Sequence, residues 1–247
     1  MSRSQFAAHR LDPEAKYGLR VTLFAAAFLL VAIPFGWLLN QVESEGSLVD
    51  LDTRGANALH GWVDGSRLAV GLFKTVTFLG APPWLWFLVV VGMVVLLRAR
   101  QWRLALFLAL TAALGGLLDT AVKLAVNRAR PSVVDPIISA HGKSFPSGHA
   151  MSSTIVYGSL LLVFLPMVPR RWRPAAIVAT ALLVGLIGFS RLALGVHFLS
   201  DVLGGYVLGL AWLAASAAAF RIWRVERGRP PAKVSEGLEP EAAAELR

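Results

Sequence analysis

Residues 103–126 read RLALFLALTAALGGLLDTAVKLAV, a run in which Arg103, Asp119 and Lys123 are the only charged side chains. A helix of about 20 apolar residues is long enough to cross the hydrocarbon core of a bilayer. Runs of similar character recur along the chain and predict six spans, at 21–39, 82–98, 103–126, 148–168, 174–194 and 198–220. The predicted fold class is therefore all-α, a polytopic membrane bundle of six transmembrane helices.

The composition agrees with a membrane protein. Of 247 residues, 56% are hydrophobic and 16% are charged, whereas a soluble domain carries about 25% charged residues. The net charge of +9 is distributed in short clusters of Arg and Lys between the apolar runs. This distribution is typical of membrane topology rather than of a nucleic-acid-binding surface. The chain has no cysteine, which excludes thiolate catalysis and cysteine-based zinc sites.

The region between the first two spans is predicted to contain short interfacial helices. Proline is tolerated in the first turn of a helix but breaks its interior, so Pro82 and Pro83 separate the span from a shorter helix at 68–79. That helix would lie at the interface or pack on the bundle. Upstream, a polar stretch carries apolar residues at helical spacing and predicts an amphipathic surface helix, with Asp50 or Asp52 as its cap.

The positive charges predict which ends of the helices face the cytoplasm. Clusters of Arg or Lys lie at 3–20, 98–103, 170–173 and 221–229. With six spans, all four clusters lie on one side of the membrane, which the positive-inside rule assigns to the cytoplasm.

The chain therefore divides into three regions. We expect a cytoplasmic N-terminus at 1–20, a single six-span domain at 21–222 and a disordered cytoplasmic tail at 223–247. The first apolar segment is longer than the ~7–15 residues of a cleavable signal core, so it is a retained span. The predicted location is the cell membrane (inner or plasma), with both termini cytoplasmic.

Several ionisable residues fall on the opposite, extracytoplasmic side: Lys123, Arg128, Arg130, Lys143, Arg191, His141, His149 and His197. Ionisable groups at membrane depth are costly and indicate function. Taken singly, each has a structural alternative, such as an interfacial anchor or a buried hydrogen bond. Five cations on the face that should lack them argue against these alternatives as a set.

The spacing of these residues predicts that they meet. Lys123 and Arg130 are seven positions apart and share one face of a helix that extends that far. His197 and Asp201 are four apart at the start of the last span, so the carboxylate can bond one ring nitrogen of the imidazole. Arg191 ends the preceding span, and a tight turn brings it to the same membrane surface.

This set of residues suits phosphoryl transfer. Cations around the Ser147-Gly148 turn, which precedes a helix, form an anion cradle, and the arginine fork matches phosphate oxygens. A His197 ring oriented by Asp201 is a nitrogen nucleophile, and His149 can protonate a leaving group. Phosphoryl transfer asks mainly for positioning and charge neutralisation. Acidic residues are too few to hold Mg²⁺, so the site is predicted to need neither metal nor cofactor.

Three motifs carry a family resemblance. KLAVNRARP at 123–131 has the form K-x6-RP, 146–149 read PSGH, and SRLALGVHFLSD at 190–201 has the form SR-x5-H-x3-D. In this order they resemble the signature of the type-2 phosphatidic acid phosphatase superfamily, which vanadium-dependent haloperoxidases share. The resemblance covers 100–220 closely, and the six-span layout extends it over 21–220.

The resemblance implies a role for each matching residue. His197 would attack phosphorus and form a phosphohistidine, with Asp201 fixing its tautomer, while His149 would act as general acid and then general base. The phosphoryl oxygens would be bound by Lys123, Arg130, Arg191, Ser147 and the Gly148 N–H.

Four nearby residues lie outside the signature. Asp119 is one turn before Lys123 and could hold that side chain extended, or form a structural ion pair with it. Arg128, His141 and Lys143 could contact a second phosphate or a head group, or be solvated loop charges.

The sequence thus predicts an integral-membrane lipid phosphatase with an extracytoplasmic site. Its substrate would be undecaprenyl diphosphate, phosphatidylglycerol phosphate or phosphatidic acid, with membrane lipids as neighbours and no nucleic-acid partner. A phosphotransferase of the same superfamily is the alternative, followed by a non-catalytic lipid-binding or transport protein. Six apolar spans argue against a soluble haloperoxidase. The motifs do not separate these lipids, and no oligomeric state follows from them.

Overall fold

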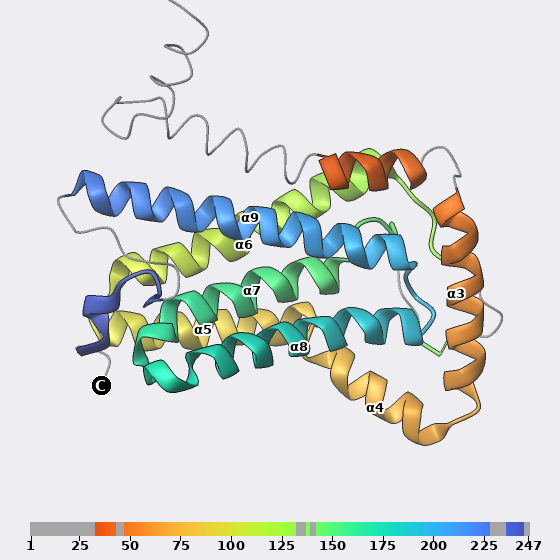
Figure 1. The fold of residues 1–247 in the computed structure, drawn as a ribbon, viewed down its shortest axis with the longest axis horizontal. Helices are drawn as coiled ribbons and strands as arrows, with labels where there is room; N and C mark the ends of the chain where they lie inside the picture. Colours follow the sequence, from red (N-terminus) through yellow and green to blue (C-terminus); the bar gives the residue numbers. More distant parts are fainter. Residues whose placement is uncertain (1–32, 43–46, 132–136, 139–141, 228–235, 245–247) are drawn as a thin grey trace, which may run out of the picture.

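A computed structural model describes residues 33–42, 47–131, 137–138, 142–227 and 236–244, and in these ranges it contains helices and no strand. Figure 1 shows the arrangement. Residues 33–42 are helical. The helices described from end to end are α3 (Ser47–Asp64), α4 (Arg67–Phe78), α5 (Pro82–Arg98), α6 (Trp102–Val126), α7 (Gly148–Phe164), α8 (Arg173–Ala193) and α9 (Leu199–Glu226). Short 3-10 turns occupy Leu165–Met167, Arg170–Trp172 and Pro240–Ala244.

Several of these helices are long and apolar enough to cross a membrane. Within the described residues there are 4, at Trp102–Val126, Gly148–Met167, Arg170–Ala193 and Leu199–Val225. The pair α4 and α5, bent by 42° at its break, could form one more. Leucines such as Leu117, Leu182 and Leu210 are exposed on the outer faces of these helices, as expected where lipid covers a protein. The predicted first span, 21–39, falls mostly outside the described residues, so the count of six stays a prediction.

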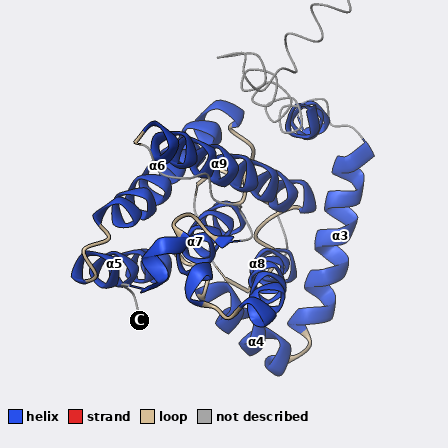
Figure 2. Ribbon diagram, turned by 60° about the vertical axis from the view of Figure 1, so that its left-hand side comes forward, coloured by secondary structure: helices blue, strands red, loops and turns tan. Residues whose placement is uncertain are grey.

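Helix α7 is the centre of the bundle and contacts α5, α6, α8 and α9 (Figure 2). Its span is 56% buried, more than any other candidate span in the described chain. Glycines on α9 allow the closest of these approaches. A Cβ on Gly205 would lie 2.7 Å from the Ser147 carbonyl oxygen, and one on Gly209 would lie 3.0 Å from the Met151 carbonyl oxygen. This tight packing fixes the start of α9 against the start of α7.

The break between α4 and α5 lies where the sequence predicted it. Pro82 and Pro83 occupy the first turn of α5, where the missing proline N–H groups have no helical acceptor to lose. Helix α4 packs on α8, which is one of the two placements expected for the 68–79 helix. The turn is tight against the bundle, since a Cβ on Gly80 would lie 2.4 Å from Ile187 Cγ2.

Helix α3 crosses the end of the bundle where α8 ends and α9 begins (Figure 1). The predicted helix in this stretch exists, and Ala56 and Val63 are buried on its inner face. The predicted cap is wrong for both candidates. The helix begins at Ser47, so Asp50 and Asp52 lie within it. A location at the membrane interface stays a prediction.

Within the predicted disordered tail, 223–247, the structure describes residues 223–227 and 236–244, and these include the end of α9 and a 3-10 turn. Helix α9 continues to Glu226, and residues 236–244 pack back on the bundle. Arg224 is 2% exposed and donates to the Leu238 carbonyl oxygen at 2.7 Å. Leu238 N in turn donates to the Leu162 carbonyl oxygen at 3.1 Å. A buried guanidinium needs acceptors, and this segment supplies them, which composition alone did not reveal.

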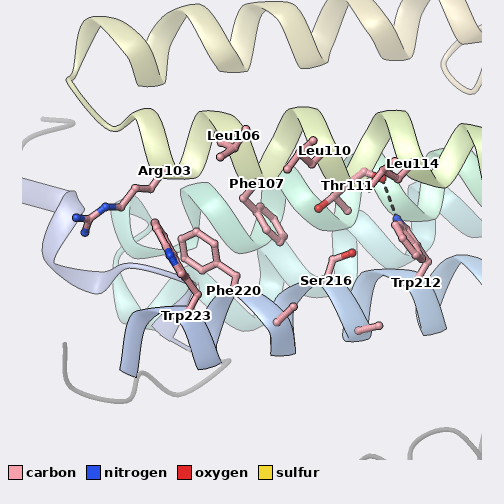
Figure 3. Close-up of a pocket in the computed structure, with 12 residues that line it drawn as sticks. Arg103, Leu106, Phe107, Leu110, Thr111, Leu114, Trp212, Ser216, Phe220 and Trp223 are labelled. Carbon is pink, nitrogen blue, oxygen red and sulfur yellow. Dashed lines mark hydrogen bonds between the residues drawn. The ribbon is translucent and has the colours of Figure 1, made fainter. Parts of the chain in front are cut away.

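An apolar groove of about 530 Å³ lies between α6 and α9 (Figure 3). Trp212 Nε1 donates to the Thr111 carbonyl oxygen across it at 2.9 Å. At one end the Arg103 guanidinium lies 5.2 Å from the centroid of the Trp223 ring. No residue of the three sequence motifs lines this groove, so it is separate from the candidate site.

Candidate active site

The three sequence motifs meet at the end of the bundle that α3 crosses. They come from the loop after α6, the start of α7 and the turn between α8 and α9. Two backbone hydrogen bonds hold these segments together. Ser147 N donates to the Asp201 carbonyl oxygen at 2.9 Å, and Ser144 N donates to the Arg128 carbonyl oxygen at 2.9 Å. Gly195, with φ +71, provides the left-handed residue that the α8–α9 turn requires.

His197 lies at the centre of the site and is 2% exposed. Its Nδ1 is 3.3 Å from Asp201 Oδ2, the hydrogen bond that the four-residue spacing predicted. Its Nε2 is 3.0 Å from Arg130 Nη1. Because a guanidinium only donates, Nε2 must be the accepting nitrogen and the ring proton sits on Nδ1, toward the carboxylate. This tautomer directs a lone pair at the cationic side of the site.

Burial lowers the pKa of His197 to about 4, although the hydrogen bond and charge of Asp201 act in the opposite direction. Desolvation disfavours the imidazolium form. The ring is therefore neutral at pH 7, the state in which its nitrogen is nucleophilic.

Arg130 and Arg191 approach His197 from two segments. Arg130 donates from Nε to the Gly142 carbonyl oxygen at 3.1 Å and from Nη1 to the Val196 carbonyl oxygen at 2.9 Å. Arg191 is 5% exposed and donates from Nη1 to Thr77 Oγ1 at 2.8 Å. Its Nε has no acceptor among the described residues. The hydroxyl that accepts from Arg191 is neutral, so the charge of Arg191 can be compensated by an anion.

The start of α7 brings Ser147, Gly148 and His149 to the same place. Ser147 Oγ is buried and has no hydrogen-bond partner in the described chain. Gly148 is the first residue of α7, so its N–H belongs to the donors that a helix start leaves without an intrahelical acceptor. His149 is half-buried and close enough to Arg191 and Lys123 for their charges to act on its ring. An unpartnered hydroxyl at a helix start fits an oxyanion ligand.

Lys123 reaches this helix start from α6. Its Nζ is 2.5 Å from Asp119 Oδ2, so the two side chains form the pair that their spacing suggested. A Cβ on Gly148 would lie only 2.6 Å from Lys123 Nζ and 3.2 Å from Asp119 Oδ2. The glycine therefore leaves the space that the ammonium group occupies. Asp119 Oδ1 is buried without a partner in the described part of the chain.

Arg128 differs from its expectation as a head-group ligand or a solvated charge. Its Nη1 donates to Asp201 Oδ1 at 2.6 Å, and its Nη2 donates to Asp52 Oδ2 at 3.0 Å. The side chain is 11% exposed. A guanidinium held between two carboxylates has little left to offer a phosphate, so we assign it to the support of the site.

Sequence reasoning missed four polar residues of this end of the bundle. Thr77 binds Arg191, as above, and Ser144 Oγ donates to Asp201 Oδ2. Asp52 accepts from Ser200 N at 2.9 Å and from Ser200 Oγ. Their positions in the sequence gave little signal, since a serine or threonine near a helix end is common.

The structure does not test the expected head-group contacts of two further residues. Lys143 is exposed, and His141 lies outside the described residues. The described ranges contain no group of three or more His, Asp or Glu that could hold a metal ion. Metal independence therefore stays a prediction.

Fold and site together define a class, an all-helical membrane protein with a buried histidine–carboxylate pair among buried and partly buried cations. A sequence model of the PAP2 superfamily matches residues 102–224. The chain is 35% identical over 139 residues to phosphatidylglycerophosphatase B of Bacillus subtilis, which covers 55% of this chain and 67% of that protein. This chain belongs to the PAP2 superfamily, as the motifs predicted.

Two other proteins extend the likeness. Lipid A 1-phosphatase of Rhizobium johnstonii is 31% identical over 121 residues, which cover 45% of this chain and 46% of that protein. The crystal structure of a transmembrane PAP2 type phosphatidylglycerolphosphate phosphatase from Bacillus subtilis superposes with a TM-score of 0.72. It is 25% identical in sequence and covers 77% of this chain and 94% of that one.

Proposed function

We propose that this membrane protein is a lipid phosphatase that passes the phosphoryl group of its substrate to His197 and then to water. One observation carries the proposal. His197 has Nδ1 against Asp201 at 3.3 Å and Nε2 toward Arg130 at 3.0 Å. A neutral imidazole in this tautomer, with its Nε2 lone pair directed at cations, is suited to attack an anionic phosphate once that phosphate takes over the hydrogen bond of Arg130.

In the first step the His197 Nε2 lone pair forms a bond to phosphorus and the bond from phosphorus to the lipid oxygen breaks. His149 donates a proton to that leaving oxygen. Arg130, Arg191 and Lys123 neutralise the phosphoryl oxygens, and Ser147 and the Gly148 N–H donate to them. Stabilising charge at positions fixed before the reaction is the main contribution that a protein makes to phosphoryl transfer.

In the second step water attacks phosphorus and the bond to His197 Nε2 breaks. His149, now neutral, accepts the proton from water, and inorganic phosphate leaves. Asp201 holds the Nδ1 proton of His197 in both steps. The residues that we name require no metal or cofactor.

The relatives favour phosphatidylglycerol phosphate as the first substrate to test, because two of them are phosphatases named for this lipid. Undecaprenyl diphosphate and phosphatidic acid complete the panel. Release of free phosphate, rather than its appearance on a second lipid, would separate hydrolysis from transfer.

Replacing the nucleophile tests the mechanism. We expect purified His197→Ala to release phosphate at least about 1,000-fold more slowly than the wild type, because removing a covalent nucleophile leaves only binding and charge stabilisation. Wild-type protein quenched with alkali after mixing with ³²P-labelled substrate should retain label that acid removes, and His197→Ala should retain none. Wild-type rates from His197→Ala would refute the mechanism.

We also propose that the site faces away from the cytoplasm, in line with the positive-inside pattern. The chain lacks cysteine, so a single Lys143→Cys variant reports the site end and Arg171→Cys the opposite end. In intact cells a membrane-impermeant maleimide should label Lys143→Cys, and Arg171→Cys only after permeabilisation. The reverse pattern would overturn the orientation.

A further inference from the structure

Asp52 is a buried carboxylate on α3, far in sequence from the three motifs. It is 1% exposed. It accepts a hydrogen bond from Ser200 N at 2.9 Å and another from Ser200 Oγ, and it pairs with Arg128 Nη2 at 3.0 Å. A carboxylate so placed is costly to bury, so its charge requires an explanation.

Arg128 connects Asp52 to the candidate nucleophile. Its Nη1 donates to Asp201 Oδ1 at 2.6 Å and to Ser200 Oγ at 2.7 Å. Its guanidinium carbon also lies 4.3 Å from the centroid of the Phe198 ring, a contact favourable for a cation. The ring and the two carboxylates fix the plane of the guanidinium.

The two oxygens of Asp201 have different partners as a result. Oδ1 accepts from Arg128, while Oδ2 accepts from Phe198 N at 2.9 Å and faces His197 Nδ1 at 3.3 Å. With both oxygens occupied, the carboxylate cannot rotate. Asp52 holds Arg128, Arg128 holds Asp201, and Asp201 sets the plane of the His197 imidazole.

We propose that Asp52 and Arg128 are positioning residues for His197, and that α3 completes the active site through this chain of contacts. The inference rests on the proposed function. Asp52 balances the charge of Arg128, so that Asp201 keeps enough negative charge to orient and polarise the imidazole.

A purely structural role is the competing explanation, because Asp52 also accepts a backbone N–H in the first turn of α9. The two roles predict different kinetics. Loss of positioning lowers kcat in the folded protein and leaves KM nearly unchanged. Loss of a helix contact lowers the melting temperature and leaves kcat of the folded fraction alone.

The pH dependence of the rate also distinguishes a positioning role of Asp52 from a structural one. His197 is faced by Asp201 from α9, Arg191 from α8, His149 from α7 and Arg130 from the loop after α6. None of these changes in the variants below. Asp52→Asn removes a negative charge, which favours the neutral ring and moves the acidic limb of the rate profile to lower pH. Arg128→Gln removes a positive charge and should move it to higher pH.

The experiment measures kcat, KM, melting temperature and pH profile with full-length protein in detergent and phosphatidylglycerol phosphate. We expect kcat to fall about 10-fold in Asp52→Asn and about 100-fold in Arg128→Gln, since small misplacements of a reacting group are this costly. KM should stay within about threefold. The double variant should match Arg128→Gln alone, because Asp52 acts through Arg128 and the effects do not add.

The matched control is Asp64→Asn, an exposed carboxylate on the same helix, which should leave kcat unchanged. Should Asp52→Asn fail to fold, Ser200→Ala decides the question. It removes one hydroxyl between Asp52 and Arg128 and should lower kcat about threefold.

The outcomes are distinct. A wild-type protein that releases phosphate, together with Asp52→Asn or Ser200→Ala at wild-type kcat and an unmoved acidic limb, overturns this inference and leaves the function intact. A wild-type protein that releases no phosphate from any lipid of the panel overturns the proposed function itself.

Discussion

The two ends of the bundle each hold a nearly buried arginine, and the acceptors around them differ in charge. At the end that carries residues 236–244, Arg224 is 2% exposed and pairs with Glu241 at 3.1 Å and Glu239 at 4.0 Å. At the site end, Arg191 is 5% exposed and donates to the neutral hydroxyl of Thr77 at 2.8 Å. One end therefore surrounds its buried arginine with carboxylates, and the other end gives its buried arginine a neutral acceptor.

The difference distinguishes a structural arginine from one prepared for a ligand. A buried charge is expensive unless an opposite charge accompanies it. Arg224 receives that charge from its own chain. Arg191 meets the neutral Thr77 hydroxyl instead, and we propose that an arriving phosphate supplies the missing negative charge. Figure 1 places the two ends at opposite ends of α9.

Removing Arg224 should have the largest effect on stability. Arg224→Met leaves Glu239, which is 1% exposed, without its cation, and breaking a buried pair in this way costs about 3–5 kcal/mol. The melting temperature should fall while kcat of the folded protein stays the same. Arg227→Met, at an exposed arginine one turn later, is the control and should change neither. An unchanged melting temperature in Arg224→Met would remove the basis of the comparison.

Removing Arg191 should instead affect catalysis. We expect Arg191→Gln to lower kcat/KM about 100-fold, the usual cost of losing one preorganised donor to a developing charge. The melting temperature should stay the same or rise, because the substitution removes a buried positive charge that no carboxylate of the described chain neutralises. Arg171→Gln, exposed at the opposite end, is the control. A loss of stability as large as that in Arg224→Met would make Arg191 a structural residue.

A substitution at Gly148 with a smaller expected effect tests whether Lys123 binds the phosphate. An alanine Cβ would meet Lys123 Nζ at 2.6 Å, and the flexible end of that lysine can move aside at little cost in stability. We expect Gly148→Ala to lower kcat/KM about 10-fold because the ammonium group leaves the phosphate position. Gly116→Ala places its Cβ in open space on the same helix as Lys123 and should leave the rate unchanged. Equal rates for both variants would exclude Lys123 from phosphate binding.

The smallest expected effect is that of mild acid. The pKa of His197 is lowered to about 4 by burial, so its neutral form persists as the pH falls from 7 to 5.5 and is lost only near pH 4. Over that upper interval protonation of His197 should lower kcat/KM less than about twofold, once the ionisation of the substrate, followed by ³¹P NMR, is divided out. Protonation of His149, the proposed general acid, acts in the opposite direction. A His197-dependent limb near pH 6.5 would show an ordinary, solvated imidazole.

Sequence reasoning predicted the parts of this protein that rest on local spacing. The apolar runs predicted the helices because a span must be apolar over about 20 residues. His197 and Asp201 were paired from their separation of four, and Asp119 and Lys123 were paired in the same way. The family was identified from three short motifs in order, and the comparisons confirm it.

The parts that sequence could not predict depend on residues distant along the chain. Asp52 and Ser200 are separated by 148 positions, and no periodicity connects them. Arg128 and Arg130 are two positions apart with the same side chain, yet one binds carboxylates and the other approaches His197. Residues 236–244 likewise lack apolar periodicity, and their contacts with the buried Arg224 join positions far apart in the fold.

By itself, then, the sequence determined the apolar helices and the superfamily, and it named the residues for which we propose a chemical role, because hydropathy and i,i+4 contacts are local properties. The tertiary structure alone decided that Arg128 meets carboxylates and that Arg191 meets a neutral hydroxyl. That choice depends on how α3, α7, α8 and α9 pack at one end of the bundle, where a few ångströms determine whether a carboxylate or a neutral oxygen meets each guanidinium.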